Sequence, residues 1–452
     1  MIKIWNNEQT DWRIELNTDQ GFLSTTMGSD GRVLTVGLGD RAELTPERIR
    51  RAAAKAIKTV TPLGAGSAVL DATGIAGALG REAVAAAAQG TELAGYRQES
   101  FKEQTNRDFT LYIDGKFNFN AEAALLEAQV LTRAVCFARD LVNCPANKLT
   151  PDIMAHRMTE AAERLGIETQ ILDENEAREL GMEAFLTVGL SSLNPPRLIV
   201  LRYHGGKPEQ APIALVGKGV TLDTGGYSLK PASSLKGIKG DMAGGAAVCG
   251  AVLALAENRV PVNVTAVIPA AENRISPNSY IPGDVIGSMC GKTIEIGNTD
   301  AEGRLMLADA VTYAIRRENA ARVVDIATLT GAVVAMFGFT TAGYLCSDDT
   351  FDSDFRRAYE QSGEQYWRLP IFPEYKRMIE SPVADLSNTS SDGCGTITAG
   401  LFIEAFTEGK PWIHLDIAGT AWVDSPRIEY QTKGATGAGV TTLYELCKEY
   451  AK

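Results

Sequence analysis

Histidine is scarce in this chain, which has only three among 452 residues: His156, His204 and His414. Cysteine is also sparse, with seven residues scattered along the chain and no C-x-x-C pair. This pattern argues against a disulfide framework and against a structural zinc site, and it is typical of a reducing compartment. We therefore expect a cytoplasmic protein.

Long apolar runs and excess positive charge are missing as well. No stretch approaches the eighteen or more apolar residues of a membrane helix, and Met1–Glu8 lacks the apolar core of a signal peptide. The net charge of −12 disfavours nucleic acid as a partner. The one basic stretch, Arg48–Lys58, is interpreted as the solvated face of a helix. We expect neither a membrane nor nucleic acid among the partners.

The length predicts two domains, and the composition, with 45% hydrophobic and 22% charged residues, is that of a folded globular protein. Residues 1–120 are predicted to form a smaller N-terminal α/β domain. A long helix from residue 121 to about 141 ends at Asn143-Cys144-Pro145, because proline cannot continue a helix, so 121–147 is the expected junction. Within the first domain we expect strands at 33–38 and 110–113, helices from Thr45-Pro46 and over 80–89, and a charged surface stretch at 98–108.

Residues 148–452 are predicted to form a larger catalytic α/β domain with a mainly parallel central sheet flanked by helices. Two of its expected strands, 198–201 and 213–216, are near-continuous apolar runs, as in strands buried on both faces. The other expected strands cover 262–268, 323–326, 342–345 and 412–417. Helices are predicted over 244–257 and from Arg304, and 391–395 is expected to be a surface loop.

The glycine-rich stretch 216–304 gathers residues that can perform chemistry. They lie just after the apolar runs, and loops at the carboxyl ends of strands are where open α/β sheets place their sites. The set consists of four carboxylates, Asp223, Asp241, Asp300 and Glu302, and three cations, Lys218, Lys230 and Arg304.

Asp300-Ala301-Glu302 indicates a metal site. In an extended segment, residues two apart point to the same side, so both carboxylates would converge and require a cation or a shared proton. With Asp223 and Asp241, four carboxylates balance two divalent cations such as Mn²⁺, Mg²⁺, Co²⁺ or Zn²⁺. No histidine lies in these loops. The alternative, ordinary surface salt bridges with the three cations, fits less well with glycine turns after buried strands.

Three segments closely resemble the leucyl aminopeptidase (cytosol aminopeptidase) family: Gly217–Lys230, Lys239–Gly245 and Asn298–Leu305. The last of these is a highly specific signature of that family. Asp140–Asn147 and Asp325–Ala332 are similar to further family segments, so the resemblance covers roughly 138–445. It implies a metal-dependent aminopeptidase that releases N-terminal amino acids through a water activated by two metals, with Mn²⁺ or Zn²⁺ favoured over Co²⁺ or Mg²⁺.

The resemblance also implies roles for individual residues. Lys230 and Arg304 would be the catalytic pair, and the enzyme would be a homohexamer acting on peptides with a free N-terminus. Ile238 stands where relatives often have methionine, beside the pocket for the amino-acid side chain. The implied metal ligands are Lys218, Asp223, Asp241, Asp300 and Glu302, and the expected substrate pocket includes Ile238, Thr328, Leu329 and Gly331.

The site lacks an evident general base, because all four acids are committed to metal and an arginine stays protonated. Arg304 should stand at the start of a helix, where the backbone favours an anion. We therefore expect bicarbonate at Arg304, held by the guanidinium fork and acting as the base; the family resemblance implies the same.

Two other functions remain open at this point. A two-metal phosphoesterase would use similar carboxylates, although it would need more cationic side chains around the phosphate. A protein with the aminopeptidase fold and an added DNA-binding or regulatory role is the other alternative, and the net charge of −12 disfavours it.

Overall fold

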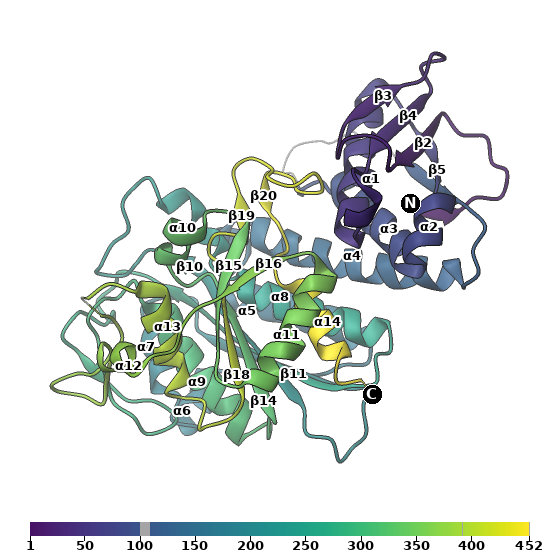
Figure 1. Ribbon diagram of the computed structural model, residues 1–452. Helices are drawn as coiled ribbons and strands as arrows, with labels where there is room; N and C mark the ends of the chain where they lie inside the picture. Colours follow the sequence, from purple (N-terminus) through teal and green to yellow (C-terminus); the bar gives the residue numbers. More distant parts are fainter. Residues whose placement is uncertain (100–108, 391, 452) are drawn as a thin grey trace. The chain divides into compact units, whose positions relative to one another are not determined.

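The computed structural model describes residues 1–99, 109–390 and 392–451, and these divide into two compact α/β units (Figure 1). Unit 1 consists of Met1–Cys136 and Val423–Gly434, and unit 2 of Phe137–Trp422 and Ala435–Lys452. The division falls within the long helix α4 (Ala121–Asn143). The predicted fold class, a smaller N-terminal and a larger C-terminal α/β part, is confirmed.

Unit 1 contains a six-stranded sheet whose pairs are parallel except for its edge strand β3. Helices α1 (Pro46–Val60) and α3 (Arg81–Gly95) pack against each other. Thr45 caps α1 through its hydroxyl, as predicted. The strand order is β1 (Ile2–Ile4), β6 (Thr110–Asp114), β5 (Ser67–Asp71), β2 (Trp12–Asn17), β4 (Val33–Gly37) and β3 (Thr25–Met27). The sequence analysis predicted β4 and β6 and missed the others.

The basic stretch on α1 is not simply a solvated face. Arg50 is only 6% exposed, and its guanidinium contacts Gln89 of α3 and Glu47. Arg51 pairs with Glu429. The expectation fails for Arg50 because α3 covers that side of the helix, at the point where the small residue Gly90 meets the Arg50 backbone.

Unit 2 is built on a nine-stranded sheet, within the described residues, whose central strands β18, β14, β9 and β11 run parallel. The outer strands β8 and β15 run antiparallel to their inner neighbours. The order is β16 (Gln365–Arg368), β15 (Thr341–Cys346), β18 (Trp412–Asp416), β14 (Arg322–Ala327), β9 (Ile213–Gly217), β11 (Asn263–Asn273), β8 (Arg197–His204) and β7 (Glu168–Leu172), with β10 (Gly219–Asp223) paired to β11. All six predicted strands are present.

Helices cover both faces of this sheet (Figure 1). One layer consists of α5 (Pro151–Glu163), α8 (Ala243–Glu257), α11 (Asp349–Ser362) and α14 (Val440–Lys448). The other is centred on α7 (Glu183–Gly189), α9 (Glu302–Arg316) and α13 (Gly395–Glu404), with the short α6 (Glu174–Glu179), α10 (Gly331–Phe337) and α12 (Pro373–Arg377) beside them. The central strands are therefore buried on both sides, which explains their continuous apolar sequences.

Some predicted boundaries shift. The strand expected at 262–268 continues to Asn273, and the helix expected from Arg304 begins two residues earlier, at Glu302. The loop expected at 391–395 is irregular over its described residues 392–394, and α13 begins at Gly395. Most of the charged stretch 98–108 lies outside the described residues.

One helical stretch, Gly237–Glu257, is long and apolar enough to span a membrane by length and composition alone. Within unit 2, however, 78% of its apolar window is buried. The apolar sequence of α8 is thus accounted for by its place against β9, β11 and β14 in the core.

The first turn of α8 lies directly against the strand ends that carry the candidate site. The backbone N–H of Gly245 donates to the carbonyl of Lys218 at 2.7 Å. A Cβ atom on Gly244 would lie 2.0 Å from the carbonyl oxygen of Ile326, on β14. Only glycine permits this approach, so Gly244 sets how closely the helix can meet the sheet.

We predict that Gly244→Ala lowers the stability of the protein by about 1–3 kcal/mol, the usual cost of forcing extra volume into a packed core. The measurement is the midpoint of thermal unfolding. Gly237→Ala is the matched control, because no atom lies within 4 Å of a Cβ placed there. An unchanged midpoint for Gly244→Ala would contradict the packing constraint.

Candidate functional site

Two of the candidate residues lie where β9 gives way to β10. Lys218 is the single residue between these strands, and Asp223 is the last residue of β10. Both strands pair in parallel with β11, over successive parts of its length. Lys218 and Asp223 therefore lie at the carboxyl ends of two strands that follow one another along β11, on the side of the sheet at which the sequence predicted a site.

The other carboxylates come from segments that follow the strands. Asp241 caps the C-terminal end of the short 3₁₀ helix Leu235–Gly240. Asp300 lies in a turn, and Glu302 is the first residue of α9. Asp300 and Glu302 are therefore not in an extended segment, contrary to the reasoning from the sequence. Their carboxylates still converge, because the chain turns into the helix between them.

The four carboxylates and two lysines form one cluster. Oxygen atoms of Asp223, Asp300 and Glu302 lie within 4.8 Å of one another. The Nζ of Lys218 lies 2.8 Å from both Asp241 Oδ1 and Glu302 Oε1. The Nζ of Lys230 lies 2.7 Å from Asp223 Oδ2 and 2.5 Å from Asp300 Oδ1.

These contacts are not ordinary surface salt bridges, because three of the six groups are buried and the other three are half-buried. The side chains of Lys218, Asp223 and Glu302 are at most 3% exposed. Burial, reinforced by the neighbouring carboxylates, raises the pKa of Asp241 to about 8, even though Lys218 opposes the shift. Burial and the Asp223 carboxylate likewise raise the pKa of Asp300 to about 6.

Burial acts on the lysines in the opposite direction, but the nearby carboxylates outweigh it. Burial alone would lower the pKa of Lys218, but Asp241, Glu302 and Asp223 together raise it above its usual value. The pKa of Lys230 is raised in the same way, chiefly by Asp223 against the effect of burial. Concentrated negative charge is therefore the dominant electrostatic property of this site.

The donor set fits divalent cations. Asp241 Oδ2, Asp300 Oδ1 and Glu302 Oε1 are buried and accept no hydrogen bond from the described residues, although the last two contact lysine nitrogens. Buried carboxylate oxygens without hydrogen bonds are costly unless a cation faces them. Carboxylate ligands of this kind suit Mn²⁺, Mg²⁺ and Zn²⁺.

Arg304 lies in the first turn of α9 and is 8% exposed. One guanidinium nitrogen donates to the carbonyl of Asn388 at 2.7 Å, whereas its Nε has no hydrogen-bond partner among the described residues. Burial lowers the pKa of Arg304 to about 10, which leaves it a cation at neutral pH. The side chain thus retains donor capacity toward the cavity that it lines.

A cavity of about 440 Å³ brings most of these groups together. Its lining includes six of the seven predicted metal and catalytic residues, and three of the four residues expected in the substrate pocket: Lys218, Asp223, Lys230, Asp241, Asp300 and Arg304, with Thr328, Leu329 and Gly331. Glu302 is buried beneath it. Ile238 is half-buried on the 3₁₀ helix and is not among the described residues that line the cavity.

Three buried residues that hold this site in place were not predicted. Asn273, the last residue of β11, donates to Asp223, and Asn388 bonds the segment that precedes Asp300. Asp416, at the end of β18, accepts from Leu329 and Thr330. Asn273 and Asp416 each end an apolar strand, so the signal that identified Asp223 could have found them. Asn388 carries no such signal.

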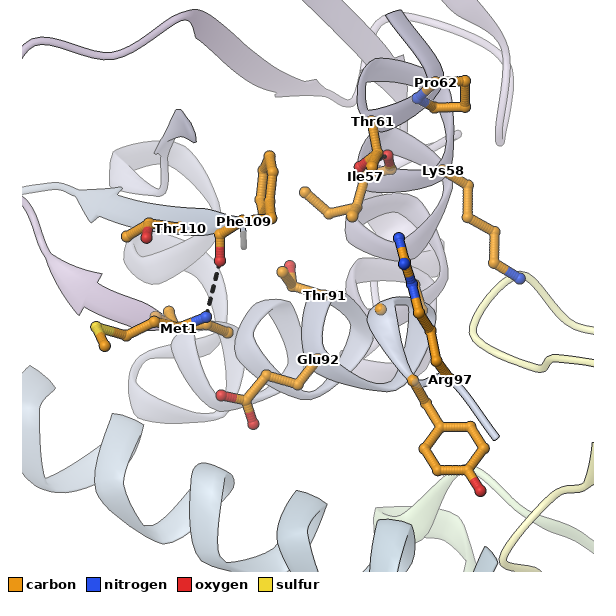
Figure 2. Close-up of a pocket in the computed structure, with 14 residues that line it drawn as sticks. Met1, Ile57, Lys58, Thr61, Pro62, Thr91, Glu92, Arg97, Phe109 and Thr110 are labelled. Atoms are coloured by element: carbon orange, nitrogen blue, oxygen red, sulfur yellow. Dashed lines mark hydrogen bonds between the residues drawn. The ribbon is translucent and has the colours of Figure 1, made fainter. Parts of the chain in front are cut away.

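Unit 1 contains a larger cavity of about 690 Å³, between α1, α3 and β6 (Figure 2). Among the described residues that line it, Glu92 is the only carboxylate. Figure 2 shows the amino group of Met1 donating to the carbonyl of Phe109, at 2.8 Å. A single acid does not provide the donor set of a divalent metal site, so the chemistry lies in unit 2.

Comparisons with known proteins also distinguish an N-terminal domain from a catalytic domain. Residues 136–444 match the model of the cytosol aminopeptidase family catalytic domain, and residues 22–105 match that of the family's N-terminal domain. A protein named "Probable cytosol aminopeptidase" from Clostridium perfringens (strain 13 / Type A) is 45% identical over 430 residues, covering 93% of this chain and 87% of the relative. A protein of the same name from Alkaliphilus oremlandii (strain OhILAs) is 42% identical over 429 residues, covering 93% and 86%.

Solved structures are similar over nearly the whole chain. The bottromycin maturation enzyme BotP in complex with Mn superposes with a TM-score of 0.89 at 34% identity, covering 98% of this chain and all of that one. A mutant of tomato leucine aminopeptidase gives a TM-score of 0.85 at 34% identity, covering 94% and 83%. The chain therefore belongs to the cytosol aminopeptidase family and is a metal-dependent aminopeptidase.

Proposed function

We propose that this enzyme removes N-terminal amino acids from peptides with two divalent metal ions, held by Lys218, Asp223, Asp241, Asp300 and Glu302. The observation that carries the proposal is the convergence of four carboxylates and Lys218 at one cavity. Mn²⁺ is the first candidate, since the similar enzyme BotP has been solved with Mn; Zn²⁺, Co²⁺ and Mg²⁺ have compatible ligand preferences.

Two bound divalent ions supply Lewis-acid activation of a water and of the scissile carbonyl. The protein positions the groups around them. Lys230 presents an ammonium at the cavity wall, where it stabilises the oxyanion that develops on the carbonyl. Such a donor lowers the activation free energy by roughly 3–4 kcal/mol.

Thr328, Leu329 and Gly331 form part of the substrate wall, and Ile238 contributes to side-chain preference from the neighbouring 3₁₀ helix. The Thr328 hydroxyl donates to Asp241 Oδ1 at 2.8 Å, and its carbonyl accepts from Lys218 at 3.1 Å. This wall is therefore connected directly to two of the proposed ligands. Asp416 supports it from below through Leu329 and Thr330.

The proposal extends to a homohexamer in the cytoplasm. The family's description and the seven free cysteines support the location. The resemblance of the site segments supports the assembly, which the native mass in solution tests.

A phosphoesterase fits less well, because both lysines that line the cavity contact carboxylates. Among the described residues that line the cavity, this leaves Arg304 as the one cationic side chain that could bind a phosphate. A DNA-binding role finds little support in a net charge of −12.

Asp300→Asn should remove metal and activity together while the fold survives, because an amide lacks the charge that holds a divalent ion. We expect a loss of more than about 100-fold in kcat/KM, since even removing an outer partner of a ligand costs about 10–100-fold. Elemental analysis and leucyl-nitroanilide hydrolysis are the measurements, with the exposed Asp424→Asn as control. An active Asp300→Asn enzyme with full metal content would refute the ligand assignment.

Metal affinity should rise with pH. Lys218 binds a metal only as a neutral amine, and the carboxylates whose pKa is raised must also lose their protons, so protons compete with metal. For each proton that the metal displaces, the metal affinity rises about tenfold per pH unit while the pH is below the pKa of that group. Mn²⁺ titrations between pH 6 and 9 measure this dependence. An affinity independent of pH would exclude Lys218 as a ligand.

Bicarbonate should accelerate turnover through Arg304, which lines the cavity and whose Nε has no hydrogen-bond partner within the part of the chain that the structure describes. A bound bicarbonate would accept a proton from the attacking water, and a general base typically contributes about 10²–10⁴-fold. Initial rates in carbonate-free buffer, with and without bicarbonate, test the idea in wild type and Arg304→Ala. An equal response in both proteins, or none in wild type, would contradict this role.

A further inference from the structure

Asn273 lies between two loops that carry proposed metal ligands, and its side chain bonds to both of them. It is the last residue of β11, fully buried, and the parallel pairing of β10 with β11 places it opposite Asp223. Its side-chain nitrogen cannot bind a metal ion, and the reaction described above does not use the residue. Asn273 is not among the described residues that line the cavity, so its burial opposite Asp223 needs another explanation.

The amide nitrogen of Asn273 makes two hydrogen bonds of equal length. It donates to Asp223 Oδ1 at 2.9 Å and to the carbonyl oxygen of Thr299 at 2.9 Å. Both partners are acceptors only, so the amide orientation is determined: the reversed amide would set its oxygen against a carboxylate and a carbonyl. The two N–H groups of one side chain thus reach two separate segments of the chain.

These segments are the ones that bear the ligands. Asp223 begins the loop that leads to Lys230, and Thr299 immediately precedes Asp300. The backbone of Asn273 also accepts from the N–H of Thr224, at 3.0 Å, and from its hydroxyl, at 2.9 Å. Thr299 completes the connection, because its hydroxyl donates to Gly225 and accepts from Ser228.

The bond to Asn273 also affects how Asp223 can bind a metal. Its Oδ1 accepts from Asn273 and from the N–H of Gly225 at 2.8 Å, so both lone-pair directions of that oxygen are used. Its Oδ2 faces the cluster, 2.7 Å from Lys230 Nζ. Asn273 therefore fixes which oxygen of Asp223 is offered to a cation.

We propose that Asn273 is a positioning residue that sets metal affinity by holding Asp223 and the Asp300 loop in one geometry. This inference rests on the proposed function, because it takes Asp223 and Asp300 as ligands. Outer partners of metal ligands orient them, and their loss typically lowers metal affinity by about 10–100-fold.

The test compares Asn273→Ala and Asn273→Leu, the second of which keeps the approximate shape and removes both donors. Asn263 offers a matched control on the same strand: it is buried, and its amide donates to the carbonyls of Lys207 and Gln210, at 2.7 and 2.8 Å. Asn263→Leu removes the same chemistry at the opposite end of β11. Mn²⁺ affinity, the visible spectrum of the Co²⁺-loaded protein and the midpoint of unfolding are measured for each.

We expect both Asn273 variants to bind Mn²⁺ about 10–100-fold more weakly and to show an altered Co²⁺ spectrum, with kcat partly restored at saturating metal. Asn263→Leu should lower the unfolding midpoint and leave metal affinity unchanged. Wild-type affinity and spectrum in a folded Asn273 variant would overturn the inference. Failure of the wild-type protein to bind Mn²⁺ or Co²⁺ would instead refute the proposed function, so the two outcomes are distinct.

Discussion

Repulsion among four clustered carboxylates, two of them buried and two half-buried, is the constraint on which the organisation of unit 2 depends. Asp223, Asp241, Asp300 and Glu302 converge from separate segments, and their charges cannot remain together without cations between them. Lys218 and Lys230 provide part of this compensation. The remaining demand for positive charge is what makes the site a receptor for divalent ions, and it explains why so many neighbouring groups serve only to hold oxygens in place.

The sheet supplies the rigidity that such a cluster needs. The central strands are buried on both faces, and their carboxyl ends present Lys218, Asp223 and the segment after Ala327 at one edge. Helix α8 meets that edge without intervening side chains, because Gly244 allows backbone contact. A charged site can therefore be maintained next to an apolar core, with hydrogen bonds from Thr328 and Asn273 fixing carboxylates that would otherwise rotate.

Much of this was predictable from the sequence, and the limits have physical causes. Buried strands of this sheet have largely apolar sequences, so six of its nine described strands were predicted, and with them the edge where the site lies, whereas β7, β10 and β16 were missed. The extended geometry assumed for Asp300 and Glu302 was wrong, because one sequence pattern fits both a strand and a turn entering a helix. Short amphipathic strands such as β2 gave too weak a signal. Asn388 could not be found, since its role arises from tertiary contacts with segments about 90 residues away.

The position of Lys218 between β9 and β10 has a further consequence. Both strands pair with β11, over 264–267 and 270–273, so together they follow one nearly continuous extended path. Side chains alternate along a strand, and the register shift between Val220 and Leu222 already places one extra residue in this path, so a further residue inserted after it would turn Asp223 away from the cluster. Substitutions in this stretch would change the metal affinity by degrees, whereas a single inserted or deleted residue would remove Asp223 from the proposed ligand set. The number of residues between Lys218 and Asp223 is therefore constrained more tightly than the identity of those residues.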